Sequence, residues 1–388
     1  MNPFAAIFVP DEIAEALTDH AWLEALLECE RALANAESLA GVIPAASAAA
    51  IAEACDAAAY DAATIAEAGR GPGNPVQPLV QQIRSRVGEA HAGYVHRGAT
   101  SQDILDSASM LVARNVLRTI DDELSALAAR CAALAHEHRA SVMAARTLLQ
   151  QAVPTTFGYK AAGWLLAVVE VRTRLAEVGE AVPAQLGGAA GTLAALGADG
   201  PEVARLYAAE LDLREPLLPW HVNRLPVAWL AGALAATAGV AAKIAGDVVL
   251  LAQTEVGEVR EADGGTSSTM PHKSNPAAAV LAVACERHAR ANAAVLLESI
   301  AGEHERPAGA WHAEWHALQT ALAATGGAVG AILRSLAGLT VDTQRMRDNL
   351  SGATLAEAEK MGIHGVAPQD YLGGVDTFID RALARYGS

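Results

Sequence analysis

The stretch LPVAWLAGALAATAGVAA, residues 225–242, runs without a single charged side chain. Its length is the lower limit for a membrane-spanning helix. However, it is rich in Ala and Gly, it contains a proline, and Lys243 and Asp247 follow it at once. We therefore interpret it as a helix buried in a bundle. A helix that is apolar on all sides is surrounded by other helices, often from other copies of the chain, so the stretch also indicates an oligomer.

The composition supports a helical bundle. Hydrophobic residues make up 52% of the 388 residues and aromatic residues only 4%, which predicts a core of Ala, Leu and Val and an all-α fold. Apolar periodicity predicts long helices, at residues 103–140, 157–182, 225–260, 276–303 and 312–338. We expect an elongated long-helix bundle at residues 91–339, flanked by smaller helical domains at residues 1–90 and 340–388.

Charge and cysteine content narrow the function class. A net charge of -16 argues against nucleic acid and anionic membranes as partners, because phosphate groups attract clustered Lys and Arg. An anionic substrate would need a few local cations. The four cysteines show no CxxC spacing and are expected to be buried free thiols. The first residues lack the basic start of a secretory signal, so we predict a cytoplasmic protein.

Three polar motifs stand out from this apolar background. In GATSQD, residues 98–103, Thr100 and Asp103 have the spacing of a capping box, and the start of a long helix is also a site for anions, with Ser101 as a further donor. The second motif, ARTLLQQAVPTTFG at residues 145–158, joins two predicted helices. It carries more hydrogen-bonding side chains than a connection needs, Gln150 among them.

The third motif is GGTSSTMPHKSNP, residues 264–276. Lys273 can neutralise a carboxylate, and Ser267 can remove a proton if N–H donors and nearby cations stabilise its alkoxide. A Ser/Gly linker is the plain alternative, but linkers do not usually contain MPHKSNP. His312 and His316 have a spacing that suits zinc, but no third ligand is obvious, and we predict no metal.

These motifs together resemble those of a known enzyme family. SSTMPHKSN, from Ser267, is similar to the signature loop SSxMPxKxN of the fumarase/aspartase superfamily, and TSQD and RTLLQQAVP resemble its two other active-site regions, in the same order. The resemblance covers nearly the whole chain. Within the superfamily, GNPVQPLV, PWH and EHERPAGAWHAEW look most like the branch of the 3-carboxy-cis,cis-muconate cycloisomerases.

The resemblance implies a cytoplasmic homotetramer whose active sites are each assembled from three subunits, with a di- or tricarboxylate substrate and no cofactor. It implies chemistry through an aci-carboxylate intermediate, in which a carboxylate oxygen adds to an alkene and closes a lactone. Such an activity would belong to aromatic catabolism, in the β-ketoadipate pathway. We expect Ser267, Lys273 and His221 to be catalytic. The expected substrate-binding residues are Thr100, Ser101, Gln150, Arg224, Ser268, Met270 and Asn275.

Four positions depart from the superfamily patterns. Leu148 and Val280 stand where lyases of the superfamily usually carry the His and Glu that serve the leaving group. A carboxylate leaving group is only weakly basic and needs little help, so this double change favours lactone chemistry. Arg97 and Pro226 depart from the cycloisomerase pattern. The alternatives are a β-elimination lyase on another substituted succinate and, more remotely, a non-catalytic helical scaffold.

Overall fold

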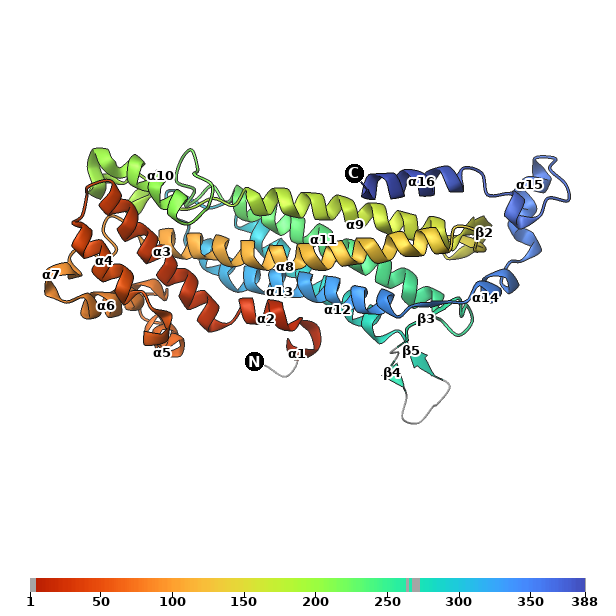
Figure 1. Cartoon of the computed structure of the whole chain (residues 1–388), viewed down its shortest axis with the longest axis horizontal. Coiled ribbons are helices and arrows are strands. Elements are labelled where there is room, and N and C mark those ends of the chain that lie inside the picture. The colour runs from red at the N-terminus through yellow and green to blue at the C-terminus, as the bar shows by residue number, and fades with distance from the viewer. Residues whose placement is uncertain (1–4, 263–264, 267–272, 388) are drawn as a thin grey trace.

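The computed structural model describes residues 5–262, 265–266 and 273–387. The chain is an elongated helical bundle with small helical parts at each end (Figure 1). The predicted all-α fold is confirmed. Its five longest helices form the bundle: α8 (Ser101–Glu137), α9 (Phe157–Glu180), α11 (Leu225–Leu251), α12 (Ala277–Glu298) and α13 (Ala310–Ala337).

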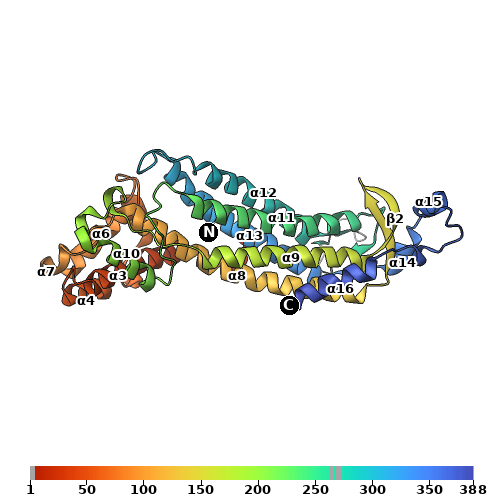
Figure 2. The same cartoon turned by 90° about the horizontal axis from the view of Figure 1, so that it is seen from above.

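The N-terminal region covers one end of the bundle. α3 packs against α4, α8 and α10 there. The helices of this end are α3 (Asp19–Leu39), α4 (Ala45–Ala54), α5 (Ala62–Ala68), α6 (Val76–Val87), α7 (Glu89–Ala92) and α10 (Gly200–Glu210). α1 (Ala5–Phe8) and α2 (Asp11–Ala16) lie along the side of the bundle, against α13 and α8. The C-terminal region comprises α14 (Thr343–Asp348), α15 (Ala356–Lys360) and α16 (Val375–Tyr386). Both views place α16 alongside α9 (Figures 1 and 2).

The strands of the described residues form three two-stranded sheets, all antiparallel. β1 (Val142–Thr147) pairs with β2 (Gln150–Thr156), β3 (Val259–Arg260) with β6 (Thr340–Val341), and β4 (Gly265–Thr266) with β5 (Ser274–Asn275). The sequence of residues 145–158 predicted only a connection between helices, whereas β1 and β2 form a hairpin there. The predicted helix at residues 225–260 was too long, because α11 ends at Leu251 and the chain turns at Gly257, whose φ is 63°.

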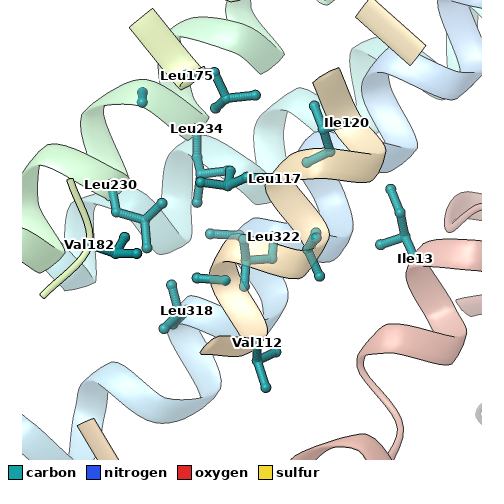
Figure 3. Close-up of a cluster of buried hydrophobic side chains, with 14 of the residues drawn as sticks. Ile13, Val112, Leu117, Ile120, Leu175, Val182, Leu230, Leu234, Leu318 and Leu322 are labelled. Carbon is teal, nitrogen blue, oxygen red and sulfur yellow. The ribbon is translucent and has the colours of Figure 1, made fainter. Parts of the chain in front are cut away.

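The core lies between the long helices. Leucine, isoleucine and valine side chains from α2, α8, α9, α11 and α13 meet in one apolar cluster, which includes Leu117, Leu234 and Leu322 (Figure 3). Glycines of α13 let the N-terminal segment approach closely. A Cβ on Gly326 would lie 2.0 Å from Ile13, and one on Gly327 would lie 2.2 Å from the carbonyl oxygen of Phe8. The four cysteines are free and buried, as predicted.

α11 and α13 are both long and apolar enough to cross a membrane by length and composition. The most apolar window of α13 is 72% buried inside the chain, as suits a core helix, whereas that of α11 is only 44% buried. Trp229 on α11 is 65% exposed, and Leu225 and Leu250 are 43% and 40% exposed. The apolar stretch at residues 225–242 is therefore only partly covered by its own chain.

Candidate active site

The first polar motif lies at the start of α8. The Thr100 backbone N–H donates to the Asp103 carboxylate at 2.9 Å, so the predicted capping box is present. Asp103 is fully buried, and it also accepts the backbone N–H groups of Gly187 and Gly188, each at 2.9 Å. Asp103 thus fixes the loop before α10 against the start of α8, while Thr100 and Ser101 stay partly exposed.

His221 is held by the same carboxylate. Its Nε2 lies 2.7 Å from Oδ1 of Asp103, which favours the tautomer with the proton on Nε2. Its Nδ1 is buried and has no hydrogen-bond partner among the described residues. A Cβ on Gly187 would lie 2.8 Å from the imidazole, so a glycine is needed beside the ring. The pairing leaves Nδ1 as the nitrogen that can accept a proton.

Arg224 has a different environment from the one expected of a substrate-binding cation. It is 1% exposed and donates to two carboxylates, Asp106 at 2.7 Å and Glu314 at 2.9 Å. The Trp311 indole N–H donates to the same Asp106 at 3.0 Å. Both carboxylates are themselves buried, so the guanidinium is needed to neutralise their charge. In the single chain, Arg224 joins α8, α11 and α13 through these two carboxylates, and its assignment to substrate binding stays a prediction.

Sequence reasoning missed two cationic side chains near Thr100. A cavity of about 260 Å³ is lined by Thr100 and Ser101 together with Arg84, His96 and residues of α6. His96 Nδ1 lies 2.6 Å from Oε1 of Glu30, which is buried. Burial alone would lower the pKa of His96, but the charge and hydrogen bond of Glu30 outweigh it, and the pKa is raised. A helix start, two hydroxyls and the Arg84 guanidinium therefore surround one small cavity, an arrangement that suits a carboxylate.

Arg306 is a third residue that sequence reasoning missed. Its guanidinium donates to the Gln102 side chain at 3.1 Å and to the carbonyl of Ala189 at 3.2 Å. Gln102 in turn donates to the backbone carbonyl of His221 at 2.9 Å. The EHERPAGAWHAEW segment thereby reaches the start of α8. The sequence signal was the segment's similarity to the cycloisomerase branch, but that similarity did not show which side chain makes the contact.

The second motif forms the β1–β2 hairpin. Its two-residue turn consists of Leu148 and Leu149, with φ values of 50° and 65° and exposures of 97% and 70%. Bulky residues rarely adopt a left-handed conformation, and such strain is common at functional sites. Gln150 is exposed beside them. Near the turn, Arg146 pairs with Gln151 across the hairpin and makes a two-point ion pair with Glu258, at 2.6 and 3.0 Å.

Most of the third motif lies outside the described residues, including Ser267, Ser268 and Met270. The two flanks of the motif are described. Gly265 pairs with Asn275 and Thr266 with Ser274, so the flanks form a short antiparallel pair of strands. Lys273 is exposed and Asn275 is partly exposed. Glu261 accepts two N–H groups at the start of α12, which anchors the motif to that helix.

The three motifs do not meet within one chain. α8 has 37 residues, which corresponds to roughly 55 Å at 1.5 Å per residue. Thr100 precedes its first turn, whereas the β1–β2 hairpin lies beyond its last turn, at the opposite end of the bundle (Figures 1 and 2). The β4–β5 hairpin projects from the side of the bundle (Figure 1). A site that uses all three motifs therefore needs more than one copy of the chain.

Comparisons with known proteins agree with these motifs. Residues 9–287 match the lyase family. The chain belongs to the fumarase/aspartase superfamily. It is 46% identical over 353 residues to 3-carboxy-cis,cis-muconate cycloisomerase of Bradyrhizobium diazoefficiens, covering 88% of this chain and 78% of the relative. It is also 46% identical over 352 residues to nitrosuccinate lyase of Streptomyces davaonensis, covering 87% of this chain and 74% of the relative.

The fold comparison gives the same family. The crystal structure of the 3-carboxy-cis,cis-muconate lactonizing enzyme from Pseudomonas putida superposes with a TM-score of 0.93 at 33% identity, covering 100% of this chain and 99% of that one. In this fumarase/aspartase enzyme, the two residues that depart from the lyase pattern are both exposed in the single chain. Leu148 is 97% exposed and Val280 51%. Among the described residues, no three His, Cys, Asp or Glu side chains are grouped as a metal site.

Proposed function

We propose that the chain is a cycloisomerase that interconverts 3-carboxy-cis,cis-muconate and its carboxymuconolactone. The observation that carries the proposal is the similarity to enzymes of that name, at 46% identity in sequence and a TM-score of 0.93 in structure. The replacement of the usual His and Glu by Leu148 and Val280 supports it, because a departing carboxylate needs little general-acid help.

In the lactone-forming direction, an oxygen of one substrate carboxylate bonds to an alkene carbon, and the alkene electrons move toward a neighbouring carboxylate to give an aci-carboxylate. A proton then adds to the carbon beside that carboxylate. In reverse, the same proton is removed and the C–O bond breaks. We propose that Ser267 delivers and removes this proton, and its alkoxide needs N–H donors and nearby positive charge. We propose that Lys273 neutralises the charge of a substrate carboxylate.

The cavity at the start of α8 is our candidate for a second carboxylate of the substrate. The α8 N-terminus, Thr100 and Ser101 supply donors, and Arg84 supplies a positive charge. We place His221, oriented by Asp103, beside this subsite as a proton-accepting group. Gln150, Ser268, Met270 and Asn275 complete the proposed substrate contacts.

We further propose a cytoplasmic homotetramer in which each site draws its motifs from three chains. The separation of the three motifs along the bundle supports this assembly. So does the exposed apolar face of α11, because monomers rarely expose patches of that kind. Activity in aromatic catabolism, in the β-ketoadipate pathway, would follow from the substrate.

A β-elimination lyase is the second candidate. It is favoured by the equal identity to nitrosuccinate lyase. Nitrite, like a carboxylate, is a weakly basic leaving group, so elimination from nitrosuccinate would also tolerate Leu148 and Val280. Elimination and the lactone-opening direction of the cycloisomerase share the first step, proton removal beside a carboxylate, and differ in the group that leaves.

The deciding experiment is an ultraviolet assay with 3-carboxy-cis,cis-muconate beside nitrosuccinate and a panel of other substituted succinates. We expect kcat/KM for the muconate to exceed that for each succinate by at least 100-fold, and Lys273→Met to raise KM for it. A preference for nitrosuccinate would replace the proposed function by the second candidate. No turnover of any of them by the oligomer would reject both.

A further inference from the structure

A second cavity lies between the β1–β2 hairpin, where Ala145, Arg146 and Thr155 of the second motif line it, and the last helix. It has a volume of about 560 Å³ and lies where α9, α11 and α16 meet. A cavity of this size suits a small organic molecule. On Gly163 of α9, which lines the cavity, a Cβ would meet nothing within 4 Å, so the space at this position is open.

The charge of the lining is opposite to that of the protein. Four cations line the cavity, Arg146, Lys160, Lys243 and Arg381, and no carboxylate side chain does so among the described residues. In a chain with a net charge of -16, such a lining is unusual. It creates a local positive potential that attracts anions.

Two of the four cations are already neutralised. Arg146 pairs with Glu258, and Lys243 pairs with Asp247. Lys160 has no ion pair with any residue in the described part of the chain, and burial lowers the pKa of its ammonium. Arg381 likewise has no carboxylate partner among the described residues, and it lies over the Phe378 ring, 5.6 Å from its centre. Lys160 and Arg381 come from different helices, and their charges remain available to a ligand.

The rest of the lining is largely apolar. Tyr159 and Phe378 have ring centres 6.1 Å apart, and they are 42% and 49% exposed. Leu166, also in the lining, is 39% exposed. Exposed apolar side chains beside available cations suit a molecule with an apolar body and anionic ends.

We propose that this cavity binds a small carboxylate with an aromatic or unsaturated body, held by Lys160 and Arg381 and stacked against Tyr159 and Phe378. The site is separate from the proposed substrate contacts, and the inference does not rest on the proposed cycloisomerase activity. An occupant would touch the hairpin, α9, α11 and α16, and would therefore join the last helix to the bundle.

Isothermal titration with benzene-1,3-dicarboxylate tests the proposal on the full-length protein. We expect saturable binding that weakens at least tenfold in Lys160→Met and in Arg381→Gln. Gly163→Leu fills the open space without removing a charge, and it should weaken the same binding at least tenfold. Arg174→Gln is the matched control, because Arg174 lies on the same helix, outside this cavity, paired with Glu177. It should change the affinity less than twofold.

Inorganic phosphate, titrated in parallel, tests the role of the apolar body, and we expect it to bind at least tenfold more weakly. The proposal is overturned if the dicarboxylate does not bind, or if its binding is the same in wild type, Lys160→Met and Gly163→Leu. Equal affinity for phosphate would overturn the apolar part of the recognition. Thermal melting of each variant verifies folding, and the charge and steric variants test the site independently.

Discussion

The two ends of the bundle treat their polar motifs in opposite ways. At the start of α8, Asp103 is fully buried and accepts four hydrogen bonds from within the chain. At the other end, Leu148, Leu149 and Gln150 are exposed at the tip of a strained hairpin. The carboxylate of Asp103 has all its hydrogen-bond partners within a single chain, whereas the Gln150 side chain is exposed to solvent in that chain. Stability therefore depends mainly on the first region and function on the second, and mutations at the two ends should separate these properties.

The largest effect on stability is expected from Arg224→Met. It would leave Asp106 and Glu314 buried without their counter-charge, and removal of one partner from such a pair destabilises by roughly 3–5 kcal/mol. The free energy of unfolding from urea titration measures the loss. Arg174→Met, which breaks an exposed pair, is the control and should change it by less than about 1 kcal/mol. If Arg224→Met instead keeps full stability and only raises KM, the original substrate-binding assignment is right.

The next effect concerns Glu37, buried in α3. Neither of its carboxylate oxygens has a hydrogen-bond partner among the described residues, and burial raises its pKa to about 8. Between about pH 4.5 and 8, Glu37 is protonated in the folded state and ionised in the unfolded state. The free energy of unfolding therefore falls as pH rises through that range.

Glu37→Gln should flatten this dependence, by on the order of 3 kcal/mol between pH 5 and pH 9. Unfolding free energies at four pH values provide the measurement, with the exposed Glu53→Gln as control. A variant whose stability falls with pH as steeply as that of the wild type would show that Glu37 is already ionised in the folded protein.

A smaller effect is expected from Thr100→Ala. Thr100 is the N-cap of α8, and loss of an N-cap side chain costs about 1 kcal/mol. Because we also place Thr100 in the substrate site, kcat/KM should fall by more than the stability change explains. Thr100→Ser should restore both quantities. If Thr100→Ala loses stability but keeps kcat/KM, Thr100 is only a cap.

The smallest effect on stability is expected from Gln150→Ala, at the exposed hairpin. A substitution on the surface changes stability by less than about 0.5 kcal/mol. We nevertheless expect kcat/KM to fall at least tenfold, because Gln150 is a proposed substrate contact. Gln344→Ala, exposed on α14, is the control for both assays. Normal turnover by Gln150→Ala would remove the hairpin from the site.

The sequence predicted features that depend on neighbouring residues. The capping box at Thr100 and Asp103 and the long helices follow from local spacing, and both are present. The β1–β2 hairpin was missed because its turn is Leu148-Leu149 and not a glycine or asparagine pair, the usual signal for such a turn. The proposed division at residues 90 and 340 stays a prediction.

Site residues were harder to predict where a distant partner decides their role. Arg224 looked like a free cation, and nothing in its local sequence indicates Asp106, 118 residues away, or Glu314, 90 residues away. His96 was overlooked because its partner Glu30 is 66 residues away. Pairings over such separations are set by the packing of the helices, and sequence spacing does not reveal them.

The central claim is that the motifs of one active site come from different chains. It is tested most directly by mixing two impaired variants, Ser267→Ala and Gln150→Ala, after dissociation and reassembly. The mixture should gain activity above that of either variant alone, because hybrid sites can combine an intact Ser267 with an intact Gln150. A mixture as inactive as its components, or sedimentation showing a fully active monomer of 39.9 kDa, would contradict the claim.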